Sequence, residues 1–253
     1  MEQEHLKVDL TGKTAIITGG SRGIGRAISE ALAQAGANVV IAARTEDDAS
    51  SLPGTIHKTT EDIKALGGNA LAVRCDVTSA EDVQRMVETA IESFGAVDIL
   101  INNAGVLHGA SFLEMKQIEF EIVWRVNVLG PFLCSRAVLE HMIPLKRGSI
   151  LSISSGLSQS THPSNNVYSA SKAGLNRMML KLAREVAEHN IAVNLLNPGF
   201  LRSEGVIARV GSDVVDRLPP PSVAAPSAVW LAAQDASFTG KVVDASKFGS
   251  EWP

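Results

Sequence analysis

The stretch Thr18-Gly19-Gly20-Ser21-Arg22-Gly23-Ile24-Gly25 decides the fold, because it joins a strand to a helix through a run of glycines. The residues before it, Thr14–Thr18, are mostly apolar or β-branched, and the alanine-rich residues 24–35 that follow have helical length. Glycines at such a junction let the backbone turn tightly and approach a pyrophosphate, which the N–H groups and dipole of a helix N-terminus attract. The spacing differs from the standard GxGxxG fingerprint, so a simple tight turn is the alternative interpretation.

Strand-length apolar runs alternate with helix-length amphipathic stretches along the rest of the chain. Because buried strands separated by helices form βαβ units with right-handed crossovers, this pattern predicts an α/β fold with a doubly wound parallel sheet and helices on both faces. The expected strands are 14–18, 38–43, 71–75, 97–101, 149–154 and 191–196, and the expected helices are 24–35, 60–66, 80–94, 111–142 and 166–189. No repeat or linker divides residues 1–253, so we expect a single domain.

Two segments interrupt the alternation, the polar residues 45–59 and the proline-punctuated residues 203–226. Long loops in a compact domain are usually functional or mobile. Ligands of open parallel sheets bind outside the carboxyl ends of the strands, the edge from which residues 203–226 depart, so we expect this segment to be a substrate lid. Its apolar lining would suit a hydrophobic substrate, although packing on the core or on another subunit is an equal alternative; the lining residues are Val206, Ile207, Val210, Val214, Val215 and Leu218.

Composition and charge exclude several classes of partner and site. The 253 residues are 45% hydrophobic and carry a net charge of -4 without a basic stripe or cluster, which argues against nucleic acid and membrane as partners. The N-terminus lacks a signal-peptide pattern and the longest apolar runs have strand length, so we expect a cytoplasmic protein. Cys75 and Cys134 form no CxxC pair, and we expect two reduced, buried thiols. The six histidines make no metal-ligand spacing, so we expect no metal.

The end of the second expected strand indicates the form of the cofactor. In dinucleotide sites of this geometry an acidic residue about 20 positions beyond the glycines holds the ribose 2′-hydroxyl of NAD, whereas an arginine accommodates the 2′-phosphate of NADP. Here the strand ends Ala42-Ala43-Arg44 without an acid, and Arg22 adds a positive charge within the glycine block. The sequence therefore predicts NADP(H), with two merely solvated arginines as the alternative.

The one tyrosine of the chain, Tyr168, stands four residues before Lys172. On a helix this spacing puts a phenol and an ammonium on one face, where the positive charge favours phenolate and lowers a pKa that is ordinarily about 10. Such a phenol suits general acid–base catalysis. The pair alone is common by chance, and a buried tyrosine beside a solvated lysine is the alternative interpretation.

With Asn102-Asn103-Ala104-Gly105 after the fourth strand, these blocks make the chain resemble the short-chain dehydrogenases/reductases over about residues 10–243. The resemblance implies a Rossmann-type sheet of about seven strands and an NADP(H)-dependent oxidoreductase acting on a carbonyl or secondary alcohol. It implies that the catalytic residues are Asn127, Ser155, Tyr168 and Lys172, with Ser155 chosen over Ser154 by its spacing to the tyrosine. The implied cofactor contacts are Gly19, Ser21, Arg22, Ile24, Arg44, Asp76, Val77, Asn103, Ala104, Gly105, Tyr168, Lys172, Pro198, Gly199 and Ser203.

The resemblance also implies roles for these residues. Tyr168 would donate the proton, Ser155 would hold the oxyanion, and Lys172 would lower the phenol pKa and bind the nicotinamide ribose. Asn127 would hold a water that relays protons, and Asp76 would lie beside the adenine unless it merely caps a turn. Helices 111–142 and 166–189 would pack against a second copy to give a homodimer or homotetramer.

Three local features qualify the resemblance. Leu52-Pro53-Gly54-Thr55-Ile56 resembles a branch with hydroxysteroid dehydrogenase-like proteins and citronellol dehydrogenases. The apolar lining of residues 203–226 favours a hydrophobic alcohol, ketone or aldehyde as substrate. Ser203 stands where the family often has threonine, and Val243-Asp244-Ala245-Ser246 replaces a glycine-rich C-terminal signature. A catalytically inactive NADP(H)-binding regulator of the same fold is the alternative function, although all four catalytic positions are filled.

Overall fold

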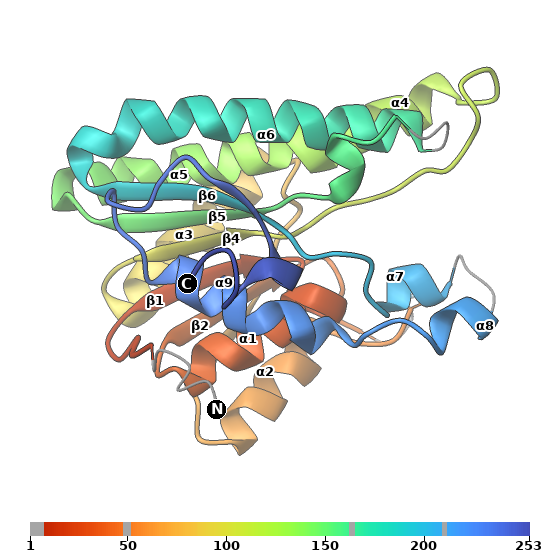
Figure 1. Ribbon diagram of the computed structural model, residues 1–253. Coiled ribbons are helices and arrows are strands. Elements are labelled where there is room, and N and C mark those ends of the chain that lie inside the picture. Colours follow the sequence, from red (N-terminus) through yellow and green to blue (C-terminus); the bar gives the residue numbers. More distant parts are fainter. Residues whose placement is uncertain (1–7, 48–51, 162–164, 209–211) are drawn as a thin grey trace.

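Seven parallel strands form one sheet in the order β3-β2-β1-β4-β5-β6-β7 (Figure 1). The computed structural model describes residues 8–47, 52–161, 165–208 and 212–253. The strands are β1 (Thr14–Thr18), β2 (Asn38–Ala43), β3 (Ala70–Arg74), β4 (Ile99–Asn102), β5 (Gly148–Ile153), β6 (Ile191–Asn197) and β7 (Val242–Asp244). Successive strands are added in opposite directions from β1, and ligands of such sheets bind beside the carboxyl ends of the strands at this reversal.

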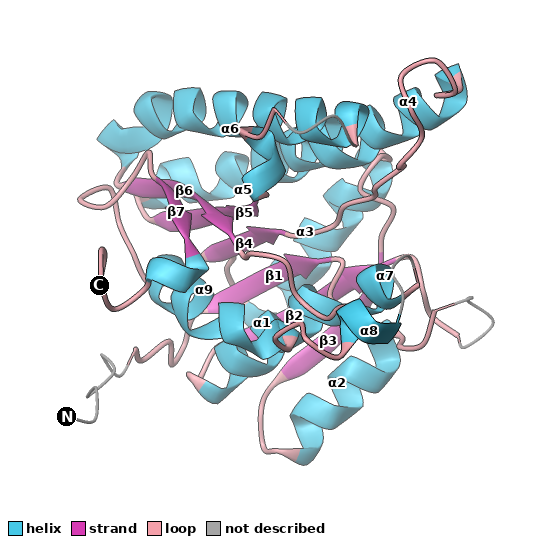
Figure 2. Ribbon diagram, turned by 45° about the vertical axis from the view of Figure 1, so that its right-hand side comes forward, coloured by secondary structure: helices cyan, strands magenta, loops and turns pink. Residues whose placement is uncertain are grey.

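Helices cover both faces of the sheet (Figures 1 and 2). One layer contains α1 (Gly23–Gln34), α2 (Ile56–Ala65) and α9 (Ala225–Ala232), and the other contains α3 (Ala80–Phe94), α5 (Gly130–Leu145) and α6 (Asn166–Val186). α4 (Gln117–Trp124) enters α5 through five π-helical residues, Arg125–Leu129, which we call the π-turn. The shorter pieces are α7 (Glu204–Ile207), α8 (Ser212–Val215) and 3-10 turns at Gly156–Ser158, Ala187–His189, Pro221–Ala224 and Ala245–Lys247.

The sheet separates two hydrophobic cores, because successive side chains of a strand point to opposite faces. In β1, Ile16 packs towards α3, α5 and α6, in what we call the α6-side core. Its neighbour Ile17 packs towards α1, α2 and α9, in the α1-side core. Leu100 and Ile101 of β4 divide in the same way, and all four side chains are fully buried. Burying each such side chain contributes roughly 1.5 to 3 kcal/mol, which is why these strands read as continuous apolar runs.

The predicted fold class is confirmed, and the six expected strands are present, β1 and β2 with the predicted ends and the other four with ends shifted by one or two residues. The prediction that all of residues 45–59 form a loop is wrong, because α2 begins at Ile56. The side chain of Thr55 accepts a hydrogen bond from the backbone N–H of Lys58 at 3.0 Å, a threonine N-cap that starts the helix.

The expected helix over 111–142 begins later and ends later than predicted. The carbonyl oxygen of Ser111 instead closes a turn with the N–H of Met115 at 3.0 Å. The helix begins at Gln117, where the side chain of Glu119 accepts a hydrogen bond from the N–H of Lys116 at 3.2 Å. The continuation α5 reaches Leu145. Within residues 203–226 the structure has α7, α8 and the Pro221–Ala224 turn, and the segment ends inside α9; residues 209–211 lie outside the described residues.

Both cysteines are buried free thiols, as predicted. Burial raises the pKa of Cys75 to about 12 and raises that of Cys134 as well, so neither side chain is a reactive thiolate. Among the described residues, no cluster of His, Cys, Asp or Glu side chains could hold a metal ion.

One helical stretch, Gln117–Leu145, is long and apolar enough to cross a membrane by length and composition alone. Core helices of globular proteins share this property. The inner face of the stretch packs in the α6-side core through Cys134, Val138 and Met142.

Candidate active site

The glycine block forms a close-packed turn between β1 and α1. Gly19 and Gly23 have positive φ angles of 67° and 56°. A Cβ on Gly25 would lie 2.3 Å from the carbonyl oxygen of Gly19, and one on Gly19 would lie 2.9 Å from the Cα of Ala104. Glycine is required at both positions, because a side chain would push the turn away from its neighbours. Arg22, the N-cap residue of α1, makes no side-chain cap hydrogen bond to this helix, and the N–H groups of a helix N-terminus attract an anion.

Asn103 and Thr18 join this turn to the end of β4. The side-chain amide of Asn103 donates hydrogen bonds to the carbonyl oxygens of Thr18 and Gly19, at 2.9 and 3.1 Å. The hydroxyl of Thr18 accepts hydrogen bonds from the N–H groups of Asn103 and Ala104, both at 3.1 Å. The Asn103 amide group therefore braces the glycine turn, and any contact of this residue with a cofactor stays a prediction.

The two predicted arginines lie differently beside the end of β2. The Nη2 of Arg22 donates to the hydroxyl of Thr45 at 3.2 Å and to the carbonyl oxygen of Gly54 at 2.9 Å. Arg44 is largely exposed, with its Nη1 4.0 Å from a carboxylate oxygen of Asp76. The guanidinium of Arg22 is thus held against the segment that follows β2, whereas that of Arg44 extends into solvent.

Asp76 caps a turn, which was the alternative interpretation from the sequence. One carboxylate oxygen accepts hydrogen bonds from the N–H and the hydroxyl of Thr78, at 2.9 and 2.8 Å. The other oxygen faces Arg44. The neighbouring Val77 is buried, and its side chain lies 2.8 Å from the position of a Cβ on Gly130 at the start of α5. Val77 therefore fixes the segment after β3 against α5.

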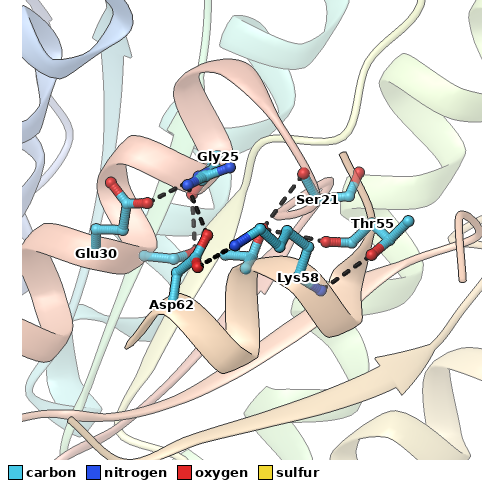
Figure 3. Close-up of polar contacts among 9 residues, drawn as sticks. Ser21, Gly25, Glu30, Thr55, Lys58 and Asp62 are labelled. Carbon is cyan, nitrogen blue, oxygen red and sulfur yellow. Dashed lines mark hydrogen bonds and ion pairs between the residues drawn. The ribbon is translucent and has the colours of Figure 1, made fainter. Parts of the chain in front are cut away.

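The start of α2 packs on the glycine turn (Figure 3). The hydroxyl of Thr59 lies 3.3 Å from the carbonyl oxygen of Ser21, as a donor. One turn later the carboxylate of Asp62 pairs with Arg26 of α1 at 2.9 Å and with Lys58 of α2. The hydrogen bond from Lys58 is the main cause that lowers the pKa of Asp62. These contacts hold α2, α1 and the glycine turn in one arrangement.

Tyr168, Lys172 and Ser155 meet at the end of β5. Tyr168 and Lys172 lie one turn apart on α6, and the Nζ of Lys172 is 5.8 Å from the centroid of the phenol ring. The Nζ also donates to the carbonyl oxygen of Ile153 at 2.7 Å. The side chain of Ser155 hydrogen-bonds the Tyr168 hydroxyl, whereas Ser154 is turned into the protein. This geometry favours Ser155 over Ser154, as the spacing predicted.

Burial sets the protonation of this group. It raises the pKa of Tyr168, and the hydrogen bond from Ser155 opposes this shift only in part. Burial also lowers the pKa of Lys172 to about 8. In the cofactor-free chain the net shift of the phenol pKa is therefore upward, and the lowering by Lys172 with NADP⁺ bound stays a prediction. Near neutral pH Tyr168 is a protonated phenol that can donate a proton.

Asn127 lies in the π-turn beside Lys172. Its side-chain oxygen accepts from the N–H of Val106 at 2.9 Å, and its side-chain nitrogen donates to the carbonyl oxygen of Val106 at 2.9 Å and to Ser171 at 3.0 Å. A Cβ on Gly105 would lie 3.4 Å from the side-chain oxygen of Asn127 and 3.6 Å from the Nζ of Lys172. The Asn127 side chain therefore braces the segment after β4 over the lysine, and the water relay stays a prediction. No pattern in the sequence indicated the π-turn, a feature frequent at functional sites.

The segment after β6 lies across from the glycine turn. Pro198 is buried, and Gly199 has a φ of 82° with its N–H donating to Asn197 at 3.2 Å. Further along, the Cβ of Ser203 lies 3.2 Å, and a carboxylate oxygen of Glu204 lies 3.3 Å, from the position of a Cβ on Gly23. Ser203 therefore lies beside the start of α1, and its contact with a cofactor stays a prediction.

Two side chains near the site were missed from the sequence. Glu204 places a carboxylate oxygen next to the start of α1, and among the described residues this buried oxygen has no hydrogen-bond partner. Asn176, on α6, binds Ser154 and Ser158 on either side of Ser155. The available signal for Asn176 was its position four residues beyond Lys172 on the same helix face.

The chain was compared with known proteins. Residues 13–210 match the family model described as short chain dehydrogenase. Glucose 1-dehydrogenase 2 of Bacillus subtilis is 36% identical over 242 residues, which cover 91% of each chain. Hydroxysteroid dehydrogenase-like protein 2 of Danio rerio is 35% identical over 237 residues, which cover 92% of this chain and 57% of the relative. The branch suggested by residues 52–56 is therefore among the relatives, at an identity no higher than that of the glucose dehydrogenase.

Solved structures share the whole fold. A protein of Beutenbergia cavernae, assigned as an NAD(P)-dependent gluconate 5-dehydrogenase and solved with NADP at low occupancy, superposes with a TM-score of 0.85. It is 29% identical, and the match covers 94% of this chain and 97% of that one. Because the family model matches residues 13–210 and the relatives are similar over nearly the whole chain, the chain belongs to the short-chain dehydrogenase family.

Proposed function

We propose that the protein is an NADP(H)-dependent oxidoreductase that interconverts a carbonyl compound and an alcohol, with Tyr168 as the general acid and base. The observation that carries the proposal is the buried phenol of Tyr168, hydrogen-bonded to Ser155 and 5.8 Å from the Lys172 ammonium, at the edge of the sheet where the glycine turn also lies.

The described residues fit a dinucleotide. The side chain of Arg22, the N-cap residue of α1, makes no hydrogen bond to the start of this helix, and a Cβ on Gly23 would meet Ser203 and Glu204. A cradle of this kind suits a pyrophosphate. When bound there, the nicotinamide supplies the hydride of the reaction.

The side chains at the end of β5 supply the proton. As a carbonyl is reduced, negative charge develops on its oxygen, and a hydrogen-bond donor within reach stabilises that charge. Tyr168 donates its proton to this oxygen, and Ser155 donates a second hydrogen bond. Lys172, held by the carbonyl oxygen of Ile153, keeps a positive charge beside the phenol and lowers the cost of phenolate once the proton has left.

Two arginines support NADP(H) over NAD(H). Arg22 and Arg44 both lie at the end of β2, where a 2′-phosphate would sit, and the strand ends without an acid. The nearest following acid, Glu46, lies 3.4 Å from the guanidinium of Arg74. Glu46 is thereby paired with Arg74, whereas Arg44 lies 4.0 Å from Asp76 and stays largely exposed, within reach of a 2′-phosphate. The bound NADP in the Beutenbergia cavernae protein is consistent with this form.

The test is consumption of NADPH and of NADH with a panel of ketones and aldehydes, for the parent protein and for Tyr168→Phe. We expect the parent protein to turn over a substrate with NADPH. Tyr168→Phe should lower this turnover by at least ~10²-fold and retain NADPH binding, because the phenol acts mainly in the transition state. Cofactor binding without turnover of any substrate would favour the inactive regulator of the same fold.

Residues 203–226 support a hydrophobic substrate. Ile207 of α7 and Val214 of α8 are 47% and 44% exposed, and Val206, Val215 and Leu218 are half-buried. Such side chains would line the inner surface of a lid that closes over substrate. Val210, the remaining member of the predicted lining, lies outside the described residues.

We infer a homo-oligomer, a dimer or a tetramer built from two dimers, and a cytoplasmic protein. The helices expected to pack against a second copy carry exposed apolar side chains, namely Ile118, Phe120 and Ile122 of α4, Leu129 of the π-turn and Phe132 of α5. Contiguous apolar surface of this kind marks protein interfaces, and a closed twofold would bury it. Light scattering at micromolar concentration should report a multiple of the 26.7 kDa chain mass.

A further inference from the structure

Three side chains on one face of α6 contact one short segment, residues 153–158. They are Tyr168, Lys172 and Asn176, spaced by four residues, so they lie one above the other along the helix. Lys172 binds the carbonyl oxygen of Ile153 at 2.7 Å, and Tyr168 is hydrogen-bonded to Ser155. The first two act at the proposed reaction centre. The third, Asn176, lies beyond it.

Asn176 holds both sides of Ser155. Its side-chain oxygen accepts a hydrogen bond from the hydroxyl of Ser154 at 2.6 Å, and its side-chain nitrogen donates to the hydroxyl of Ser158 at 3.0 Å. Only 8% of Asn176 is exposed, so water does not readily replace either partner. Losing one partner of a buried amide leaves a polar group unpaired, which is costly enough to fix this geometry.

Ser155 has few other restraints. The strand ladder ends at Ser154, whose N–H donates to the carbonyl oxygen of Leu196 at 2.8 Å. Beyond that point the chain enters the Gly156–Ser158 turn, in which the hydroxyl of Ser155 accepts from the N–H of Leu157 at 3.2 Å. The turn is therefore attached to α6 at its far end through Ser158 and Asn176. The distance between Ser155 and Tyr168 depends on that attachment.

We propose that Asn176 is a positioning residue, which clamps the Ser154–Ser158 segment onto α6 and thereby sets the hydrogen bond between Ser155 and Tyr168. The proposal rests on the proposed function for the roles of Ser155 and Tyr168. It adds a residue that touches neither substrate nor cofactor and acts through the serine.

The main test is Asn176→Leu, which keeps a side chain branched at Cγ and removes both hydrogen bonds. Asn194→Leu is the matched control, because Asn194 is also buried and also makes two hydrogen bonds, to Phe238 and Lys241, away from the Ser155 turn. We expect Asn176→Leu to lower kcat by about tenfold or more while the Kd for NADPH stays within about twofold of the parent. When Asn176→Leu and Asn194→Leu have similar Tm values, only Asn176→Leu should show this fall in kcat.

A second readout needs no activity. The chain has one tyrosine, so its ultraviolet titration belongs to Tyr168 alone. The hydrogen bond from Ser155 lowers the pKa of that phenol, so releasing Ser155 should raise the titration midpoint in Asn176→Leu but not in Asn194→Leu. This titration separates the positioning role of Asn176 from the proposed function, because it tests the hold of Asn176 on the Ser154–Ser158 segment even in a protein without turnover.

Ser158→Ala covers the case in which Asn176→Leu does not fold. It removes one hydroxyl from the half-buried turn and should give the same changes in smaller size, about threefold in kcat, with the midpoint of Tyr168 raised. Folded variants at Asn176 or Ser158 with the parent kcat and the parent tyrosine titration would overturn the proposal, and Asn176 would then only stabilise the fold.

Discussion

The Nη2 of Arg22 donates a hydrogen bond to the carbonyl oxygen of Gly54, 32 residues further along the chain, at 2.9 Å. This contact joins the glycine block to the segment before α2. Gly54 in turn lies against the backbone of Ser21. Arg22 and Gly54 therefore both help to position the part of the glycine turn that would contact the adenosine end of a cofactor.

Arg44→Ala should weaken NADPH binding and leave NADH binding nearly unchanged. Losing a charge-assisted contact to phosphate costs roughly 1.5 to 3 kcal/mol, so we expect a rise of about ten- to a hundredfold in the Kd for NADPH. Arg136→Ala is the control, since Arg136 is an exposed arginine on α5. Fluorescence titration with both cofactors gives the answer. Equal affinity of the parent protein for NADPH and NADH would contradict the predicted cofactor form.

Gly54→Ala should reduce both stability and NADPH affinity. Gly54 has a φ of 99°, and a Cβ there would lie 2.7 Å from the carbonyl oxygen of Ser21, so the substitution strains the backbone and also pushes the glycine turn. Gly67→Ala is a matched control, because Gly67 has a φ of 85° with nothing within 4 Å of the added carbon. Denaturant unfolding should show a loss of roughly 1 to 3 kcal/mol for Gly54→Ala and a smaller loss for Gly67→Ala. If both variants bind NADPH like the parent, the contact with Ser21 does not affect the cofactor site.

Glu204→Gln should tighten the binding of both cofactor forms. The carboxylate of Glu204 lies beside the start of α1, where a pyrophosphate would bind, and removing its charge removes a repulsion. The gain should be about two- to fivefold, equal for NADPH and NADH, because both share the pyrophosphate. Glu92→Gln, at an exposed position on α3, serves as control. A weaker affinity in Glu204→Gln would show that the carboxylate supports the site.

Tyr168 should titrate above its ordinary range in the cofactor-free protein, because burial raises its pKa. Adding NADP⁺ should lower the midpoint, since a positive ring beside a phenol favours phenolate. The pH profile of alcohol oxidation should rise with the midpoint of the complex. The measurement is absorbance near the phenolate band, and the three tryptophans do not ionise in that range. If NADP⁺ leaves the titration midpoint of Tyr168 unchanged, the phenol does not lie beside the bound cofactor.

Lys172→Met should change how stability depends on pH. Folding lowers the pKa of Lys172 from 10.5 to about 8, so between these values the unfolded chain binds a proton that the folded chain has released. The parent protein therefore gains stability from this lysine as pH rises through that window, and carries the full cost of burying the charge below it. We expect the parent to gain roughly 2 to 3 kcal/mol relative to Lys172→Met between pH 7 and pH 10, measured by denaturant unfolding without cofactor. Parallel curves would mean that Lys172 titrates normally.

Local sequence patterns predicted much of the fold and the centre of the site. Apolar runs located the six longer strands, and the spacing of Tyr168 and Lys172 placed both on one face of α6. The position of β7 was not predicted, because its three residues, Val242–Asp244, are too few to show a recognisable hydrophobic period. The start of α2 was missed because Thr55, an ordinary N-cap residue, stood in a polar stretch interpreted as loop.

The rest of the site depends on contacts between distant residues. No local pattern shows that Arg22 reaches Gly54 or that Asn127 braces Val106. The π-turn around Asn127 has no side-chain period that would mark it in a sequence. Residue spacing does not show that the pKa of Tyr168 is raised in the cofactor-free chain, because burial is a property of the folded molecule.

The division of the interior by the sheet has a consequence for binding. The glycine turn leads into α1 and the α1-side core, whereas Asn127, Tyr168 and Lys172 stand on elements that pack in the α6-side core. A dinucleotide spanning these groups would make contacts with both halves of the molecule at once, and opening either half would release it. Ligand binding energy would then oppose partial unfolding on both sides of the sheet, so that the two halves protect each other from local opening more strongly with the cofactor than without it.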